Sequence, residues 1–121
     1  MSTPDTERFA IEAARIAHQH NAEDVTVMDL RGLSAVTDFF VICSGTSQRQ
    51  MQTVCDMVRE HARKIDEPVY RVSGYATANW ILLDFVNVVV HIFRPEYREY
   101  YDLELLWGDA PRLDWVEPAG P

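Results

Sequence analysis

The chain contains few cysteines and no long hydrophobic run, and each shortage argues against a class of protein. Its 121 residues include two cysteines, Cys43 and Cys55, which fall at apolar positions of different predicted elements. We therefore expect buried free thiols in a reducing compartment, not a disulfide-stapled secreted domain. No apolar run approaches the roughly 20 residues of a membrane span, and the charged first residues do not resemble a signal peptide. These absences predict a cytoplasmic protein.

Basic residues are also scarce. Lys and Arg number 11 against 19 Asp and Glu, which gives a formal net charge of −8. This balance argues against non-specific binding to nucleic acid or anionic lipid, since both attract basic surfaces. It favours a basic partner, including a basic protein that itself lies on RNA. The length and the hydrophobic content of 47% are those of one globular domain with a single core.

The hydrophobic pattern predicts an α/β fold, with a mixed sheet of about five strands flanked by helices. Thr3-Pro4 is typical of a helix start, and the apolar stripe that follows ends near His20-Asn21. Strands are expected at 25–30, 39–44, 69–73, 80–85 and 88–93, and further helices at 48–65 and 95–107. Residues 1–110 then form a single α/β domain, and the proline-rich residues 111–121 form a mobile C-terminal tail.

Ser47 and Gln50 fit the capping box S-x-x-Q at the start of the second helix. The turn before them could also cradle a phosphate, because backbone N–H groups at a helix start attract anions. His18 and His20 are two residues apart and point to different helix faces, and the sequence has no C-x-x-C, H-E-x-x-H or G-x-S-x-G motif. We therefore predict no metal, no cofactor and no catalytic residue.

The stretch VVVHIF, residues 88–93, places a histidine in an otherwise apolar strand. If Val86-Asn87 is a two-residue turn, alternation gives this hairpin one wholly apolar face and one mixed face. On the mixed face Leu82 lies opposite His91, and Asp84 is a diagonal neighbour whose carboxylate could hold the ring in one tautomer. Two interpretations of His91 stay open: a hydrogen-bonded support under a covering helix, or a residue near a partner surface.

The last predicted helix is rich in aromatic and acidic side chains. Helical spacing selects a stripe that packs on the sheet, formed by Tyr97, Tyr100, Leu103 and Trp107. Tyr101, Asp102 and Glu104 are then left toward the flank or the solvent. Exposed tyrosine beside carboxylates is typical of a contact surface for a basic protein. An ordinary amphipathic helix explains the same pattern equally well.

Four stretches together resemble the ribosomal silencing factor (Iojap-like) family: VMDLRGLSAVTDFFVICSGTSQRQ, NWILLDF, VVVHIF and REYYDLELLWGD. The resemblance runs from about Phe9 to Asp109, in the family order. It implies a nucleotidyltransferase-like α/β fold without the catalytic residues. It also implies binding to ribosomal protein L-fourteen on the large subunit, which blocks association with the small subunit and lowers translation under nutrient limitation. A homodimer is implied as well.

The resemblance assigns roles to individual residues. Trp80 and Asp84 match the family's W-x-L-x-D segment, and Tyr101 and Glu104 match its Y-D-L-E segment, which includes Asp102. We predict that these five residues contact the partner.

His91 matches the family's V-V-H histidine and is predicted to support the contact residues. Trp80 is the predicted anchor of the partner surface, because it begins its strand at the expected sheet edge on the mixed face. The chain departs from the family at Val86-Asn87, where the family has Gly-Asp. Glycine takes a positive φ easily and asparagine can, whereas β-branched Val86 is not expected to do so.

Two other functions compete with this prediction. A nucleotidyltransferase enzyme needs a Gly-Ser turn followed by a D-x-D or D-x-E pair on a strand, which holds two metal ions. No such pair follows the SGTS turn on a predicted strand. A plain homodimeric adaptor is the third candidate, and it predicts no association with ribosomes.

Overall fold

The computed structural model describes residues 4–117, so the predicted cap at Thr3 lies outside the described residues. Its elements follow in chain order: α1 (Pro4–Gln19), β1 (Glu23–Asp29), β2 (Phe39–Ser44), α2 (Gln48–Lys64), β3 (Arg71–Ser73), β4 (Trp80–Asp84), β5 (Val88–Phe93), α3 (Pro95–Tyr101), α4 (Leu103–Leu106) and β6 (Arg112–Leu113). The strands form one six-stranded sheet in the order β3-β4-β5-β2-β1-β6. Among the described strands only β2 and β5 pair in parallel, so the sheet is mixed, as predicted, with one strand more than expected.

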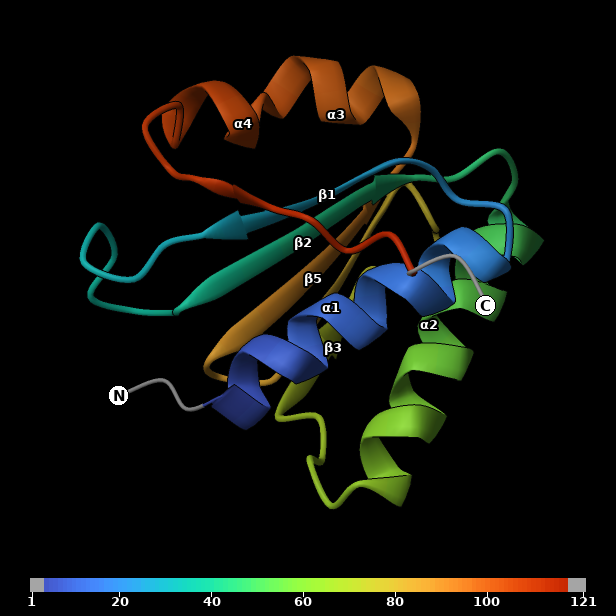
Figure 1. The fold of residues 1–121 in the computed structure, drawn as a ribbon. Coiled ribbons are helices and arrows are strands. Elements are labelled where there is room, and N and C mark those ends of the chain that lie inside the picture. The colour runs from blue at the N-terminus through green and yellow to red at the C-terminus, as the bar shows by residue number, and fades with distance from the viewer. Residues whose placement is uncertain (1–3, 118–121) are drawn as a thin grey trace.

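The helices lie in two layers, one on each face of the sheet (Figure 1). α1 and α2 cover one face, where the apolar side of the hairpin joins β1 and β2 in the larger core. α3 and α4 lie across the other face, over a smaller core that includes Met28, Ile42 and Phe93. Both cysteines lie in the larger core, and burial raises the pKa of each thiol to about 12. Both thiols are therefore protonated at neutral pH.

The start of α2 confirms the predicted cap. The Gln50 N–H donates to Ser47 Oγ at 3.1 Å, and Gln50 Oε1 accepts from the Thr46 N–H at 2.9 Å. The side chains of this turn therefore already satisfy N–H groups that a phosphate would otherwise contact. At the other end, Ile65 is the C-terminal cap and its side chain is exposed, although it continues the apolar spacing of the helix.

The β4–β5 hairpin has the predicted register. Leu82 pairs with His91, so the wholly apolar face and the mixed face are those expected from alternation. The expectation for Val86 was wrong, because this residue adopts a φ of 74°. The turn is held by hydrogen bonds from Asn87 N–H to Phe85 O at 3.0 Å and from Val86 N–H to Asp84 Oδ1 at 2.7 Å. This three-residue turn with a positive φ at its central residue is a γ-turn, and it is strained because that residue, Val86, is β-branched.

The last predicted helix is broken at Asp102. This residue has a left-handed backbone (φ 45°, ψ 56°), its N–H donates to Arg98 O, and its side chain accepts from the Leu105 N–H. Aspartate tolerates this conformation and is a good cap, so it ends α3 and begins α4. Half of the predicted packing stripe is confirmed: Leu103 and Trp107 pack on the smaller core, whereas Tyr97 is 37% and Tyr100 81% exposed.

The C-terminal segment differs from the mobile tail predicted for residues 111–121. Leu113 and Arg112 pair with Val27 and Met28 of β1 and form the sixth strand. Trp115 packs on the larger core, and its indole N–H donates to Val25 O at 2.9 Å. Residues 112–117 thus belong to the domain, while the last four residues of the predicted tail lie outside the described part of the chain.

Candidate functional site

Trp80 and His91 form a hydrogen-bonded aromatic pair on the mixed face of the hairpin. The Trp80 Nε1–H donates to His91 Nδ1 at 3.1 Å. The indole stacks on Phe93 and contacts the ring of Tyr101, with 4.7 Å between ring centroids in each case. The predicted position of Trp80 at the sheet edge is wrong, because β4 lies between β3 and β5 and the half-buried indole packs against Tyr101 of α3. Whether Trp80 anchors a partner stays a prediction.

His91 is 4% exposed, and burial lowers its pKa to about 3, so the ring is neutral at physiological pH. Because an indole nitrogen can only donate, Nδ1 is the acceptor and the single ring proton resides on Nε2. Asp84 does not fix this tautomer, contrary to prediction. One of its carboxylate oxygens accepts from the Val86 N–H, and the other lies 3.8 Å from the Arg71 guanidinium. Whether His91 supports a partner surface stays a prediction.

Two of the predicted contact residues, Asp102 and Glu104, stabilise α3 and α4. Asp102 caps both helices. Glu104 Oε1 accepts from Arg98 Nε at 2.8 Å, and this hydrogen bond lowers the pKa of Glu104. The Arg98 side chain is 12% exposed and also donates to Ser44 Oγ, which ties α3 to the end of β2. Glu104 is therefore a partner of a nearly buried cation and not a free surface charge.

The exposed parts of α3 and α4 form a second feature, which we call the α3–α4 surface and define by Glu96, Glu99, Tyr100, Tyr101, Leu105 and Leu106. Leu105 and Leu106 are 76% and 72% exposed. Large apolar side chains exposed together beside carboxylates are typical of interaction sites. The sequence analysis did not single out either leucine, although helical spacing already places Leu105 on the side away from the predicted packing stripe.

Next to this surface, the part of the mixed face that α3 and α4 leave uncovered is hollowed into a pocket of about 760 Å³. We call it the sheet pocket. Phe40, Leu82, Val89 and His91 line it from the sheet, and the loop 33–37 and Trp107 form further parts of its wall. Tyr70 and Val86, both exposed, lie at its margin. Alternation identified the mixed face, but nothing in the sequence showed that the last helices cover only part of it.

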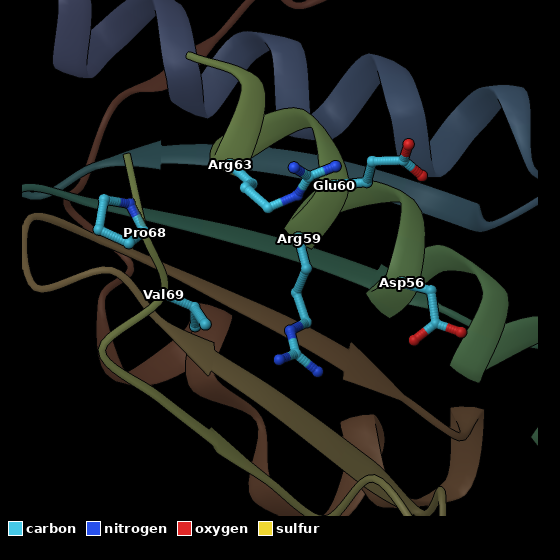
Figure 2. Close-up of a pocket in the computed structure, with 6 residues that line it drawn as sticks. All are labelled: Asp56, Arg59, Glu60, Arg63, Pro68 and Val69. Atoms are coloured by element: carbon cyan, nitrogen blue, oxygen red, sulfur yellow. The ribbon is translucent and has the colours of Figure 1, made fainter. Parts of the chain in front are cut away.

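A second hollow lies on the opposite layer of the molecule, between α2 and the segment before β3. Figure 2 shows Asp56, Arg59, Glu60 and Arg63 on α2, with Pro68 and Val69 across from them. Two carboxylates and two guanidinium groups balance each other in charge. Asp56 accepts from the Tyr75 hydroxyl at 3.0 Å, and Glu60 lies 3.6 Å from Lys64. This charge-balanced hollow has neither the chemistry of an anion site nor that of an apolar site.

The described residues contain no group of three or more histidine, cysteine or acidic side chains placed to hold a metal ion. Within the same part of the chain, no helix is both long and apolar enough to cross a membrane.

Comparisons with known proteins extend this description. A family model described as "Ribosomal silencing factor during starvation" matches residues 3–120, beyond the expected end of the resemblance at Asp109. The ribosomal silencing factor RsfS of Bacillus subtilis (strain 168) is 40% identical over 102 residues, which are 84% of this chain and 86% of that protein. The family-model match thus includes residues 112–113, which pair with β1.

Two further comparisons point to the same family and fold. The Mus musculus protein named "Mitochondrial assembly of ribosomal large subunit protein 1" is 34% identical over 95 residues, covering 76% of this chain and 42% of that protein. A crystal structure of a protein from Chromobacterium violaceum superposes with a TM-score of 0.79 and 28% identity, covering 89% of this chain and 88% of that one. The α/β architecture with a mixed sheet is thus also that of a solved relative.

Proposed function

Because the chain belongs to the ribosomal silencing factor family, we propose that it represses translation by binding ribosomal protein L-fourteen on the large ribosomal subunit. The bound protein blocks association with the small subunit and so lowers translation under nutrient limitation. It acts in the cytoplasm and without catalysis. The names of the relatives, which refer to ribosomal silencing and to assembly of the large subunit, support this proposal.

The observation that carries the proposal is the α3–α4 surface together with the sheet pocket beside it. The surface combines exposed tyrosine and leucine side chains with carboxylates, in a chain of net charge −8. A basic ribosomal protein complements such a surface: the apolar side chains supply affinity, and the carboxylates supply encounter rate and orientation. Trp107 lines the sheet pocket and follows α4 directly, so the two features are continuous.

The repression itself requires no chemical step. A folded domain of 13.9 kDa that occupies part of the joining face of one subunit excludes the other by volume alone. Repression then depends only on the affinity and lifetime of the complex, and most differences in affinity between related complexes arise in the dissociation rate.

Sedimentation with separated ribosomal subunits tests the proposal. The protein is expected to travel with the large subunit and not with the small one. Recovery of the protein only at the top of the gradient, at low and at moderate salt, would contradict it.

The two rival functions make different predictions. A nucleotidyltransferase would bind or turn over a nucleotide in a titration with magnesium, and we expect neither. A plain homodimeric adaptor would form a dimer and bind neither ribosomal subunit. We also expect the free protein to be a homodimer, which sedimentation velocity measures directly, but only the repressor is expected to bind the large subunit as well.

A further inference from the structure

The sheet pocket contains two buried polar atoms without a hydrogen-bond partner among the residues that the structure describes. These atoms are His91 Nε2 and Thr37 Oγ1. Both residues line the pocket, and both are buried, with 4% and 6% of their surfaces exposed. Buried polar groups are nearly always paired in folded proteins, so two unpaired groups in one pocket wall require an explanation.

The chemistry that His91 offers is fixed. Trp80 donates to Nδ1, so Nε2 carries the ring proton and can only donate. The low pKa of the buried ring excludes the doubly protonated form at neutral pH. Whatever pairs with Nε2 must therefore supply an acceptor, such as a main-chain carbonyl or a hydroxyl oxygen. The Thr37 hydroxyl can donate or accept, so it offers the same partner a second hydrogen bond, either as donor or as acceptor.

The rest of the pocket is suited to an apolar group. Phe40, Leu82 and Val89 are half-buried and form the sheet side of the pocket. The volume of about 760 Å³ lies within the roughly 300–1,000 Å³ typical of ligand pockets. The charges at its margin, Arg71 and Asp84, are 3.8 Å apart and oppose each other. The pocket itself is thus nearly neutral, while the adjoining α3–α4 surface is acidic.

We propose that the sheet pocket receives an apolar side chain of the basic ribosomal protein bound by the α3–α4 surface, and that an oxygen beside that side chain accepts from His91 Nε2. This inference rests on the proposed function. Nε2 is shielded from water in the free protein, and the ring of Phe40 lies 4.5 Å from that of His91. Docking therefore requires a small movement of half-buried wall residues such as Phe40, and side-chain changes of this kind are common at interfaces.

Thr37→Val separates a binding role from a structural one. The substitution keeps the shape of the side chain and removes an unpaired buried hydroxyl, so the free protein is expected to melt at the same or a higher temperature. If the hydroxyl pairs with the partner, affinity for the large subunit falls by roughly three- to tenfold, the effect of one hydrogen bond. Unchanged affinity of Thr37→Val for the large subunit would show that the Thr37 hydroxyl does not contact the partner.

Filling the pocket tests its occupancy. Val89→Phe places a ring in the pocket from the sheet side, and Ala35→Trp does so from the exposed loop, where folding is least affected. Each is expected to weaken binding to the large subunit by about tenfold or more, while Val116→Phe, an exposed site outside the pocket, leaves it unchanged. Parental affinity in both pocket variants would overturn the inference.

The same gradients distinguish the inference from the function on which it rests. If the parent protein does not travel with the large subunit, the proposed function fails, and the inference fails with it. If the parent and all pocket variants travel alike, only the pocket assignment fails. If the pocket variants lose self-association but keep subunit binding, the pocket holds a second copy of this chain and the inference is wrong.

Discussion

At the scale of single residues, the partner of His91 shows what alternation in a hairpin can and cannot decide. His91 pairs with Leu82, so Trp80 and Asp84 are its two diagonal neighbours on the same face. Register alone cannot choose between them. The choice follows from the turn, because Asp84 is occupied by the Val86 N–H and leaves the indole as the donor. The Trp80–His91 pair could have been predicted by comparing both diagonal neighbours and by noting that the turn needs an acceptor for the Val86 N–H.

We predict that Trp80 contributes to folding as well as to binding. Trp80→Phe removes the donor to His91 and is expected to lower the free energy of unfolding by about 1–2 kcal/mol. Trp80→Ala also removes the packing on Phe93 and Tyr101 and is expected to cost about 3 kcal/mol. Urea unfolding followed by circular dichroism measures both. Tyr100→Ala, at an exposed position, is the control with a change below about 0.5 kcal/mol. A Trp80→Ala variant as stable as the parent would restore a purely interfacial role.

His91 makes the stability of the domain depend on pH. Burial lowers its pKa to about 3 in the folded state, against an ordinary value near 6.5 in the unfolded chain. Between these values the unfolded state binds a proton that the folded state does not. The contribution of the neutral ring is therefore fully present above pH 6.5 and declines as the pH falls, by up to about 1.4 kcal/mol per pH unit.

The comparison variant for this pH dependence is His91→Phe, which cannot titrate. It is expected to be less stable than the parent at pH 7, because the Trp80 N–H loses its acceptor. Its free energy of unfolding should fall less steeply than that of the parent between pH 6 and pH 4. Equal slopes in the two proteins would show that His91 does not titrate with a lowered pKa.

At the scale of elements, strong periodic signals predicted most of the fold and local exceptions produced the differences. Alternation located the hairpin and its register, and the capping box located the start of α2. The break at Asp102 was missed because helical spacing continues through it; only the capacity of aspartate for a left-handed backbone marks it. β6 was missed because a pair of residues has no period, and its place depends on β1 and on the contacts of Trp115.

The β4–β5 turn carries strain that a substitution can remove. Val86 has a φ of 74°, a conformation costly for a β-branched residue and free for glycine. Its side chain is about half exposed, so little packing is lost on removal. We expect Val86→Gly to raise the free energy of unfolding by about 0.5–1 kcal/mol, after allowance for the greater entropy of the unfolded chain.

Val89→Gly serves as the matched control for this turn variant. Val89 lies within β5, where glycine weakens a strand, so the control is expected to be less stable than the parent. Thermal unfolding of the parent, Val86→Gly and Val89→Gly gives the order of their melting temperatures. A Val86→Gly variant that melts below the parent would show that the turn is not strained.

At the scale of the whole molecule, the charge distribution determines which acidic residues can test the partner surface. Glu104 is a poor choice, because Glu104→Lys would also leave the nearly buried Arg98 without its carboxylate. We therefore expect Glu104→Lys to lower the stability of the domain as well as its affinity for the large subunit. Glu96 and Glu99 are exposed on α3, and no ion pair to either is present among the described residues.

We predict that the double variant Glu96→Lys/Glu99→Lys binds the large subunit more weakly while its melting temperature stays near that of the parent. Charges at the rim of an interface act mainly on the association rate, so the difference from the parent should shrink as salt rises. Association kinetics at two salt concentrations measure this. An identical association rate in the parent and the variant at low salt would place the partner elsewhere on the molecule.

The most direct test of the account is a subunit-joining measurement. Purified large and small subunits are mixed under conditions that favour the joined ribosome, with and without a prior incubation of the large subunit with this protein, and separated on a sucrose gradient. We predict that prior incubation depletes the joined ribosome and leaves the protein on the free large subunit, and that Val89→Phe and Ala35→Trp restore joining. An undiminished peak of joined ribosomes that carries the protein would contradict it.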